Sequence, residues 1–207
     1  PMQQTARDFW NDRYREKTGE SSGKPGLVLS QFAGPLAPGR ALELGCGRGD
    51  DALWLARQGW QVTAADVSAV ALAYASESAT RAGLAGKIRF EEHDLAETFP
   101  EGVFDLVVAS FLQSPQDWPR AQVLARAAAA VSTGGRLLIT EHASRPPGSN
   151  APEDTVYPSA EETLASLDLD PRHWRRLCVC AIARAGTRAE VQGETVQDNV
   201  IFLERTQ

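Results

Sequence analysis

The sequence predicts an α/β fold in which a doubly wound, mostly parallel sheet has helices on both faces. From residue 40 onward, short apolar segments alternate with segments of helical period, which is typical of strand–helix units. The segments "LVVA" and "LLIT" are continuously apolar, as in strands buried on both faces. The last two apolar segments have no long helix between them, so we expect a hairpin-like pair that adds an antiparallel strand.

The first part of the chain predicts a helix followed by a short apolar segment. Residues 5–17 carry Trp10 and Tyr14 four residues apart, on one helical face. The polar residues 18–26 follow, then the apolar segment "LVLSQF", which Pro35 closes.

Five strands and three helices are expected in the middle of the chain. The expected strands are residues 40–44, 60–66, 87–94, 104–110 and 136–142. The expected helices are residues 50–59, 68–83 and 118–135. Gly59 and Gly83 are stop signals, Ser68 is an N-cap, and Val131 is expected on the apolar face of the third helix.

The rest of the chain predicts a long loop and two more strands, which brings the sheet to seven. Residues 143–159 are rich in proline and polar residues, as in lids or binding loops, and the strands are residues 175–184 and 199–205. We expect one domain over residues 1–207. Its parts are an N-terminal cap segment (1–37), a core (38–142), and a substrate loop with the strand pair (143–207).

Composition excludes several classes of function. The 207 residues carry a net charge of −6, which argues against general nucleic-acid binding. No run approaches the ~20 apolar residues of a membrane helix, and the first apolar run is too short and too charged for a signal peptide. The three cysteines do not suggest a disulfide framework, and Cys178-x-Cys180 is a weak metal signal. We expect a reduced, cytoplasmic compartment, no membrane partner and no metal.

The stretch "ELGCGRGDD", residues 43–51, marks the expected ligand site. It follows the first strand of the sheet, and ligands of such sheets bind at the carboxyl ends of the strands. Glycines permit close approach there, although a tight turn that packs helix on strand needs them too. Asp66 ends the second strand, 21 residues beyond Gly45, where a carboxylate can accept both ribose hydroxyls of a nucleoside.

The residues around the glycines discriminate between nucleosides. A dinucleotide site spaces its glycines G-x-G-x-x-G, whereas this one reads G-x-G-x-G. Asp50 and Asp51 would repel a phosphate at the start of the following helix, and Glu43 adds a further negative charge. S-adenosylmethionine fits better, since it is an adenosine with a sulfonium and an ammonium group and no phosphate.

The segment "ALELGCGRGDDALWLARQGWQVTAADVS" resembles the first half of a class I S-adenosylmethionine-dependent methyltransferase. The resemblance continues through "HDLAETFPEGVFDLVVAS" and "GGRLLITEH", over about residues 38–142. "FWNDRY" and "WLARQGWQVTAADVS" are most similar to the small-molecule branch that contains tellurite-resistance and thiopurine methyltransferases. The resemblance implies a Rossmann-like fold, S-adenosylmethionine as cofactor and S-adenosylhomocysteine as product.

The resemblance also implies a set of cofactor contacts. Those to the methionine part fall on Glu43, Gly45, Cys46, Gly47 and Gly49. Those to the ribose and adenine fall on Asp66, Val67, Asp94 and Leu95, and those beneath the methyl donor on Ala109, Ser110 and Phe111. Trp10 either closes over the cofactor or docks its helix on the core. In the first case a cation–π attraction between its ring and the sulfonium would contribute ~0.5–2 kcal/mol. We expect the ring of Tyr14 to pack on the core, and we do not expect Cys46 to be a nucleophile.

The methyl acceptor is expected to be a small molecule: a thiol, oxyanion, phenol or amine. The chain reads "SFLQSP" after strand four and lacks the pattern of enzymes that methylate nucleobase amines. We expect the first helix and the 110–118 and 143–158 loops to form the acceptor pocket, with Arg145 and Tyr157 as contacts. His142 is the first candidate for contacting the acceptor; the alternative is a loop histidine that faces water. The side chain of His93 is expected to point away from the site.

Two other functions remain open from the sequence. One is an NAD(P)-dependent oxidoreductase on a similar sheet, against which the glycine spacing and the acidic helix start argue. The other is a non-catalytic S-adenosylmethionine-binding module, which the cofactor motifs alone do not separate from an enzyme.

Overall fold

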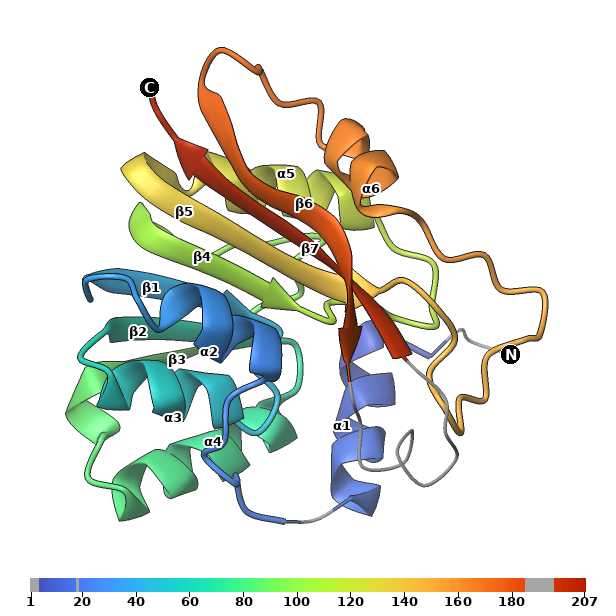
Figure 1. The fold of residues 1–207 in the computed structure, drawn as a ribbon. Helices are drawn as coiled ribbons and strands as arrows, with labels where there is room; N and C mark the ends of the chain where they lie inside the picture. The colour runs from blue at the N-terminus through green and yellow to red at the C-terminus, as the bar shows by residue number, and fades with distance from the viewer. Residues whose placement is uncertain (1–3, 18, 185–195) are drawn as a thin grey trace.

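The sheet of the protein has its seven strands in the order β3-β2-β1-β4-β5-β7-β6 (Figure 1). This computed structural model describes residues 4–17, 19–184 and 196–207. The strands are β1 Arg40–Leu44, β2 Gln61–Asp66, β3 Ile88–Glu92, β4 Phe104–Ser110, β5 Val131–His142, β6 Trp174–Arg184 and β7 Val196–Arg205. β1 to β5 pair in parallel, and β7 is antiparallel to both of its neighbours. The predicted fold class is confirmed; residues 185–195, between the last two strands, lie outside the described residues.

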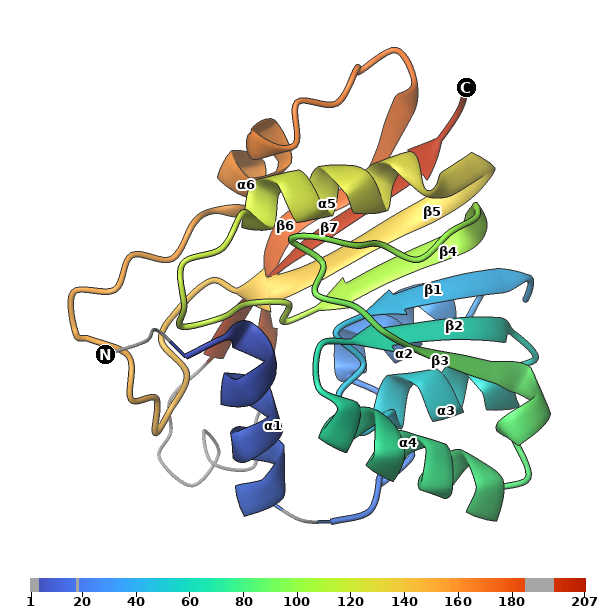
Figure 2. The ribbon, with the colours of Figure 1, turned by 180° about the vertical axis from the view of Figure 1, so that it is seen from behind.

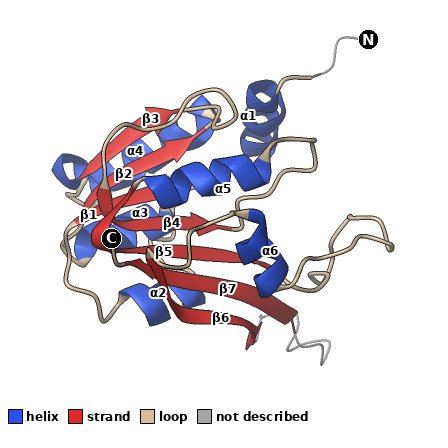
Figure 3. Cartoon of the chain, turned by 90° about the horizontal axis from the view of Figure 1, so that it is seen from above, coloured by secondary structure: helices blue, strands red, loops and turns tan. Residues whose placement is uncertain are grey.

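Helices cover both faces of the sheet (Figures 2 and 3). One apolar core joins the sheet to α2 (Leu27–Ala33), α3 (Asp50–Arg57) and α4 (Ala69–Arg81). A second core on the other face joins it to α5 (Arg120–Ala129) and α6 (Ala160–Ser166). Two further elements are α1 (Ala6–Glu16) and a short 3-10 helix, Ala85–Lys87.

Serine side chains cap the first turns of α4 and α6. Ser68 accepts a hydrogen bond from the amide of Ala71 at 3.1 Å, as expected of the N-cap of α4. Ser159 accepts one from the amide of Glu162, also at 3.1 Å, and so begins α6, a helix we did not expect. Residues 143–159 before it are irregular, as predicted.

Val131 lies in a strand and not in the third predicted helix. α5 ends at Ala129, and Val131 begins β5, where it is the register partner of Phe104. The amide of Phe104 donates to the carbonyl of Ala130 at 2.8 Å. Val131 pairs with Phe104 and Arg136 with Leu106, so the strand already begins at residue 131, although the preceding residues have high helix propensity.

The order of the strands fixes where a ligand site can form. β2 and β3 follow on one side of β1, while β4 pairs with β1 on the other side. The loops after β1 and β4 therefore diverge at the carboxyl ends of these strands, which is the place where sheets of this kind bind ligands. No helix among the described residues is long and apolar enough to cross a membrane.

Candidate functional site

The chain makes a tight left-handed turn directly after β1. The amides of Gly45 and Cys46 both donate to the carbonyl of Ala65, at 2.8 and 2.9 Å, which ties the turn to the end of β2. Gly45, Gly47 and Gly49 have φ values of +72°, +53° and +89°, which side-chain-bearing residues rarely adopt. The glycines are therefore needed for the shape of the backbone.

The glycines also differ in what they approach. A Cβ on Gly49 would lie 2.9 Å from Cβ of Ala75, so Gly49 allows α3 to pack on α4. A Cβ on Gly45 would lie 2.7 Å from Cδ1 of Leu112, and Gly45 lines both clefts described below. Gly49 is therefore needed for helix packing, whereas Gly45 lies where a side chain would extend toward Leu112 beside the clefts.

Asp66 closes the turn from the end of β2. Its Oδ2 accepts from the amide of Gly47 and its Oδ1 from the amide of Ser68, both at 2.9 Å. The residue is 8% exposed; burial raises its pKa, and the hydrogen bonds from Ser68 and Gly47 oppose that rise. Each carboxylate oxygen keeps a second lone pair for a ligand hydroxyl.

A cleft of about 710 Å³ opens at the carboxyl ends of the strands. Of the predicted cofactor residues it is lined by Trp10, Gly45, Asp66, Val67, Asp94, Leu95 and Phe111. Oδ1 of Asp94 accepts from the amide of Ala96 at 3.1 Å, so this carboxylate caps its own turn as well as lining the cleft.

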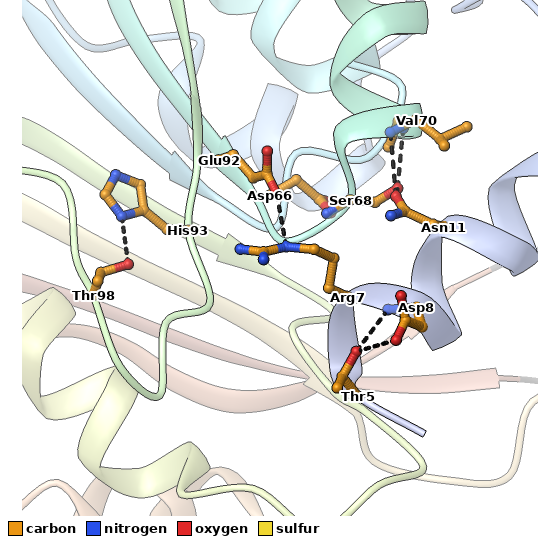
Figure 4. A network of polar contacts seen from close by, with 11 residues as sticks. Thr5, Arg7, Asp8, Asn11, Asp66, Ser68, Val70, Glu92, His93 and Thr98 are labelled. Atoms are coloured by element: carbon orange, nitrogen blue, oxygen red, sulfur yellow. Dashed lines mark hydrogen bonds and ion pairs between the residues drawn. The ribbon is translucent and has the colours of Figure 1, made fainter. Parts of the chain in front are cut away.

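Two residues line this cleft against expectation. Tyr14 was expected only to pack, yet its hydroxyl lies 2.9 Å from the position that a Cβ on Gly47 would take. Burial raises the pKa of this hydroxyl, so it stays protonated and can donate. His93 was expected to point away; the residue belongs to the cleft lining, and its ring contacts Thr98 at 2.8 Å (Figure 4) and Glu91 at 2.9 Å.

α1 is held beside the cleft by polar contacts (Figure 4). Oδ1 of Asn11 accepts from the hydroxyl of Ser68 at 2.8 Å and from the amide of Val70 at 3.3 Å. Arg7 forms an ion pair with Glu92 at 2.7 Å. No residue of α1 is fully buried, so these contacts rather than an apolar core set the position of Trp10 and Tyr14.

A smaller cleft of about 430 Å³ lies on the other side of the glycine turn. Of the predicted residues it is lined by Glu43, Gly45, Cys46, Gly47 and Ser110. Glu43 is 3% exposed, and its Oε2 has no hydrogen-bond partner among the described residues. The buried Nε and Nη2 of Arg48, which lines the same cleft, are likewise without a partner there.

This combination favours a zwitterionic ligand group. A buried carboxylate suits an ammonium, and a guanidinium suits a carboxylate. Arg48 was not predicted as a site residue, although a cationic residue between the last two glycines of the turn was a signal. Burial, together with the charges of Glu43 and Asp66, raises the pKa of the Cys46 thiol, which agrees with a residue that is not a nucleophile.

Asp50 and Asp51 hold the N-terminal segment to α3 and also line the smaller cleft. Oδ1 of Asp50 accepts from the hydroxyl of Ser21 at 2.5 Å and from the amide of Gly23 at 3.2 Å. Oδ1 of Asp51 accepts from the amide of Gly26 at 2.8 Å. These carboxylates therefore have a structural task besides their effect on the charge of the site.

Three predicted site residues line neither cleft: Gly49, Ala109 and His142. Ala109 is buried within β4. The ring of His142 packs on Phe111, which lines the larger cleft, with centroids 4.5 Å apart.

The 143–158 loop does not form the walls of these clefts either. Arg145 donates to the carbonyl of Ser149 within its own loop, and neither Arg145 nor Tyr157 lines the clefts. Residues 111–119 and α1 contribute to the lining of the larger cleft.

Comparison with known proteins gives one family model and one short match to a relative. Residues 41–135 match the model of a methyltransferase domain. A ribosomal RNA small subunit methyltransferase C from Alcanivorax borkumensis is 51% identical over 51 residues, which is 25% of this chain. The match spans 16% of the length of that relative.

Solved structures match over almost the whole chain. One solved structure was reported for the conversion of a disulfide bond into a thioacetal group during echinomycin biosynthesis. It has a TM-score of 0.71 at 23% identity, and the match covers 97% of this chain and 92% of that chain. TehB from Haemophilus influenzae has a TM-score of 0.66 at 20% identity and covers 97% of this chain and 67% of its own. At such low identities the likeness concerns the fold alone.

Proposed function

We propose that this chain is a class I S-adenosylmethionine-dependent methyltransferase whose two clefts hold the cofactor and present it to a small-molecule acceptor, since residues 41–135 match the model of a methyltransferase domain and the sheet has the corresponding strand order. The observation that carries the proposal is the charge pattern of the clefts. The larger cleft offers Asp66 for ribose hydroxyls. The smaller one offers the carboxyl of Glu43 for an ammonium and the guanidinium of Arg48 for a carboxylate, and buried polar atoms of both side chains have no hydrogen-bond partner among the described residues.

The residues of the chain act mainly by binding the cofactor and the acceptor and by aligning them with each other. When bound, the cofactor supplies a methyl group on a positively charged sulfur, which is a good leaving group. Gly45 lines both clefts, so a ligand that fills both passes directly over the turn after β1. Alignment of this kind can contribute ~7–11 kcal/mol to lowering a barrier.

A small acceptor is favoured by the wall of the larger cleft and by the charge of the chain. The wall combines Trp10, Phe111 and Trp118 with amide side chains such as Gln113, a lining that suits a compact organic molecule. The net charge of −6 does not favour an RNA backbone. The solved structure from echinomycin biosynthesis also belongs to small-molecule metabolism.

Transfer of a labelled methyl group tests the proposal. The protein would be incubated with methyl-labelled S-adenosylmethionine and a panel of phenols, amines, thiols and oxyanions, with ribosomal RNA as a separate arm. We expect label in at least one small molecule and none in RNA. Label in RNA alone, or no transfer to any acceptor while the cofactor binds, would contradict the proposed function.

The buried carboxyl of Glu43 predicts that cofactor binding releases a proton. Burial raises its pKa well above the ordinary value, and the charges of Asp51, Asp66 and Asp50 raise it further. A bound ammonium stabilises the carboxylate and lowers the pKa of Glu43. The affinity for the cofactor should therefore rise with pH between the pKa of Glu43 in the complex and its higher pKa in the free protein. Calorimetric titration with S-adenosylhomocysteine, in buffers of different ionisation enthalpy, measures the protons released.

We expect release of up to about one proton from the wild type, because a single carboxyl changes its state. Glu43→Gln should release none and bind about tenfold more weakly or worse, since a hydrogen bond to a charged group is worth ~1.5–3 kcal/mol. Equal proton release by both proteins would show that Glu43 does not meet the ammonium.

A further inference from the structure

His142 and Asp198 face each other across two neighbouring strands. His142 ends β5 and is the register partner of Asp198 in β7, so their side chains lie on one face of the sheet. Nδ1 of His142 lies 3.6 Å from Oδ1 of Asp198, which is within ion-pair reach and longer than a hydrogen bond. Asp198 is 0% exposed, and these two buried atoms have no hydrogen-bond partner in the described part of the chain.

Arg184 of β6 keeps Asp198 in its ionised form. Nε of Arg184 donates to Oδ2 of Asp198 at 2.6 Å, which leaves Oδ1 for His142. Burial raises the pKa of Asp198, but the contacts with His142 and Arg184 outweigh it, and the pKa is lowered from its ordinary value. A carboxylate can only accept hydrogen bonds, so Oδ1 of Asp198 favours the tautomer of a neutral His142 with the hydrogen on Nδ1 and a lone pair on Nε2.

Phe111 connects this pair to the larger cleft. Its φ of +52° is strained for a bulky residue, and its ring lines the cleft. The same ring packs on His142 at 4.5 Å with an interplanar angle of 34°, and the guanidinium carbon of Arg184 lies 5.7 Å from it. The His142 side chain is 27% exposed and lies against Phe111, a residue of the cleft lining.

In the described part of the chain, the charged groups that face His142 come from two strands. They are Asp198 of β7 and Arg184 of β6. The loop after β4 presents the uncharged ring of Phe111. Glu141 of β5 itself points to the opposite face of the sheet, where it forms an ion pair with Arg120. Among the described residues, the charged neighbours of His142 are therefore one carboxylate and one guanidinium.

We propose that His142 is the general base of the reaction and that Asp198 positions it in the Nδ1–H tautomer. The inference rests on the proposed methyl transfer and narrows the acceptor to a hydroxyl or an amine. A lone pair of the acceptor oxygen or nitrogen forms a bond to the methyl carbon, and the carbon–sulfur bond breaks with its electron pair passing to sulfur. The O–H or N–H proton goes to Nε2 of His142, and the imidazolium formed faces Asp198. A thiolate or an oxyanion carries no such proton.

A magnetic resonance measurement tests the tautomer without any acceptor. Long-range proton–nitrogen spectra of the ¹⁵N-labelled full chain report which ring nitrogen carries hydrogen, and His142→Gln assigns the signal among the three histidines. We expect Nδ1–H in the wild type. In Asp198→Asn the amide oxygen accepts from Arg184 and the NH₂ group faces His142, so the population should shift to Nε2–H. An Nε2–H tautomer in the wild type would overturn the inference, whatever the outcome of the transfer assays.

Phenol and thiophenol form a matched pair of acceptors. At neutral pH phenol keeps its proton and needs a base, whereas thiophenol is largely ionised and does not. Benzylamine tests an amine acceptor. We expect His142→Gln to lower kcat with phenol or benzylamine by ~10²–10⁴-fold, the usual contribution of a positioned base, with S-adenosylhomocysteine affinity unchanged. Asp198→Asn should lower kcat more than it changes KM and should alter the pH profile of kcat. Its circular dichroism should remain that of the wild type.

Two kinetic outcomes would overturn the inference. One is transfer to phenol by His142→Gln at the wild-type rate. The other is a wild-type enzyme that methylates thiols or oxyanions and never a hydroxyl or amine. Absence of transfer to every acceptor contradicts the proposed function instead, and the resonance measurement then decides the positioning role of Asp198 by itself.

Discussion

Replacing Asp66 by alanine is expected to weaken the binding of S-adenosylhomocysteine by at least about tenfold. Hydrogen bonds to a charged group are worth ~1.5–3 kcal/mol each, and 1.4 kcal/mol corresponds to a tenfold change. Asp66 also accepts from the amides of Gly47 and Ser68, so its loss loosens the glycine turn that lines the clefts. Both effects act in the same direction, and calorimetric titration measures their sum.

Asp105→Ala is the matched control for this variant. Asp105 accepts from the amide of Arg40 at 2.9 Å, so it is also a carboxylate that holds backbone, but it lies near the start of β4, away from the clefts. Its replacement should leave the affinity within about twofold of the wild type. A folded Asp66→Ala protein that binds as well as Asp105→Ala would mean that Asp66 has no part in the ligand site.

The largest effect on stability is expected at Glu141. This residue is 0% exposed, and its Oε1 lies 2.9 Å from Nη1 of Arg120. Its Oε2 accepts from the hydroxyl of Thr163 at 2.6 Å and from the amide group of Asn199 at 2.8 Å. Nε of Arg120 donates to the carbonyl of Leu112, so this network joins α6, β7 and the wall of the larger cleft.

Glu141→Gln should lower the free energy of unfolding by ~3–5 kcal/mol, because it leaves the largely buried charge of Arg120 without its partner. Urea denaturation measures the change. Glu161→Gln is the control: Glu161 pairs with Arg176 on the surface, and such pairs contribute about 1 kcal/mol or less. Losses of equal size in the two variants would contradict the role assigned to the buried network.

The local signals in the sequence were sufficient for most of the elements. Alternating apolar segments, Ser68 and the glycine stops located the strands and helices around the clefts within a few residues. The start of β5 at Val131 was missed because pairing with Phe104, a distant partner, overrides local helix propensity. α6 was missed although Ser159 and Glu162 have the spacing of a capping box.

The cross-strand pairs near the site could not be predicted. His142 faces Asp198, and Glu141 faces Asn199, because β5 and β7 pair in one particular register. These partners are more than fifty residues apart in the chain. A shift of one residue would move each side chain to the other face of the sheet, and no local signal fixes that register. His142 was therefore found as a candidate, while the groups that orient it were not.

Calorimetric titration of the wild-type protein with S-adenosylhomocysteine and, separately, with NAD tests the central claim most directly. The claim is that Asp66, Glu43 and Arg48 form a site for a nucleoside without phosphate that carries an amino-acid group. We expect S-adenosylhomocysteine to bind with a dissociation constant on the order of micromolar, near −8 kcal/mol, and NAD to give no measurable heat of binding. Binding of NAD with no binding of S-adenosylhomocysteine would contradict the account.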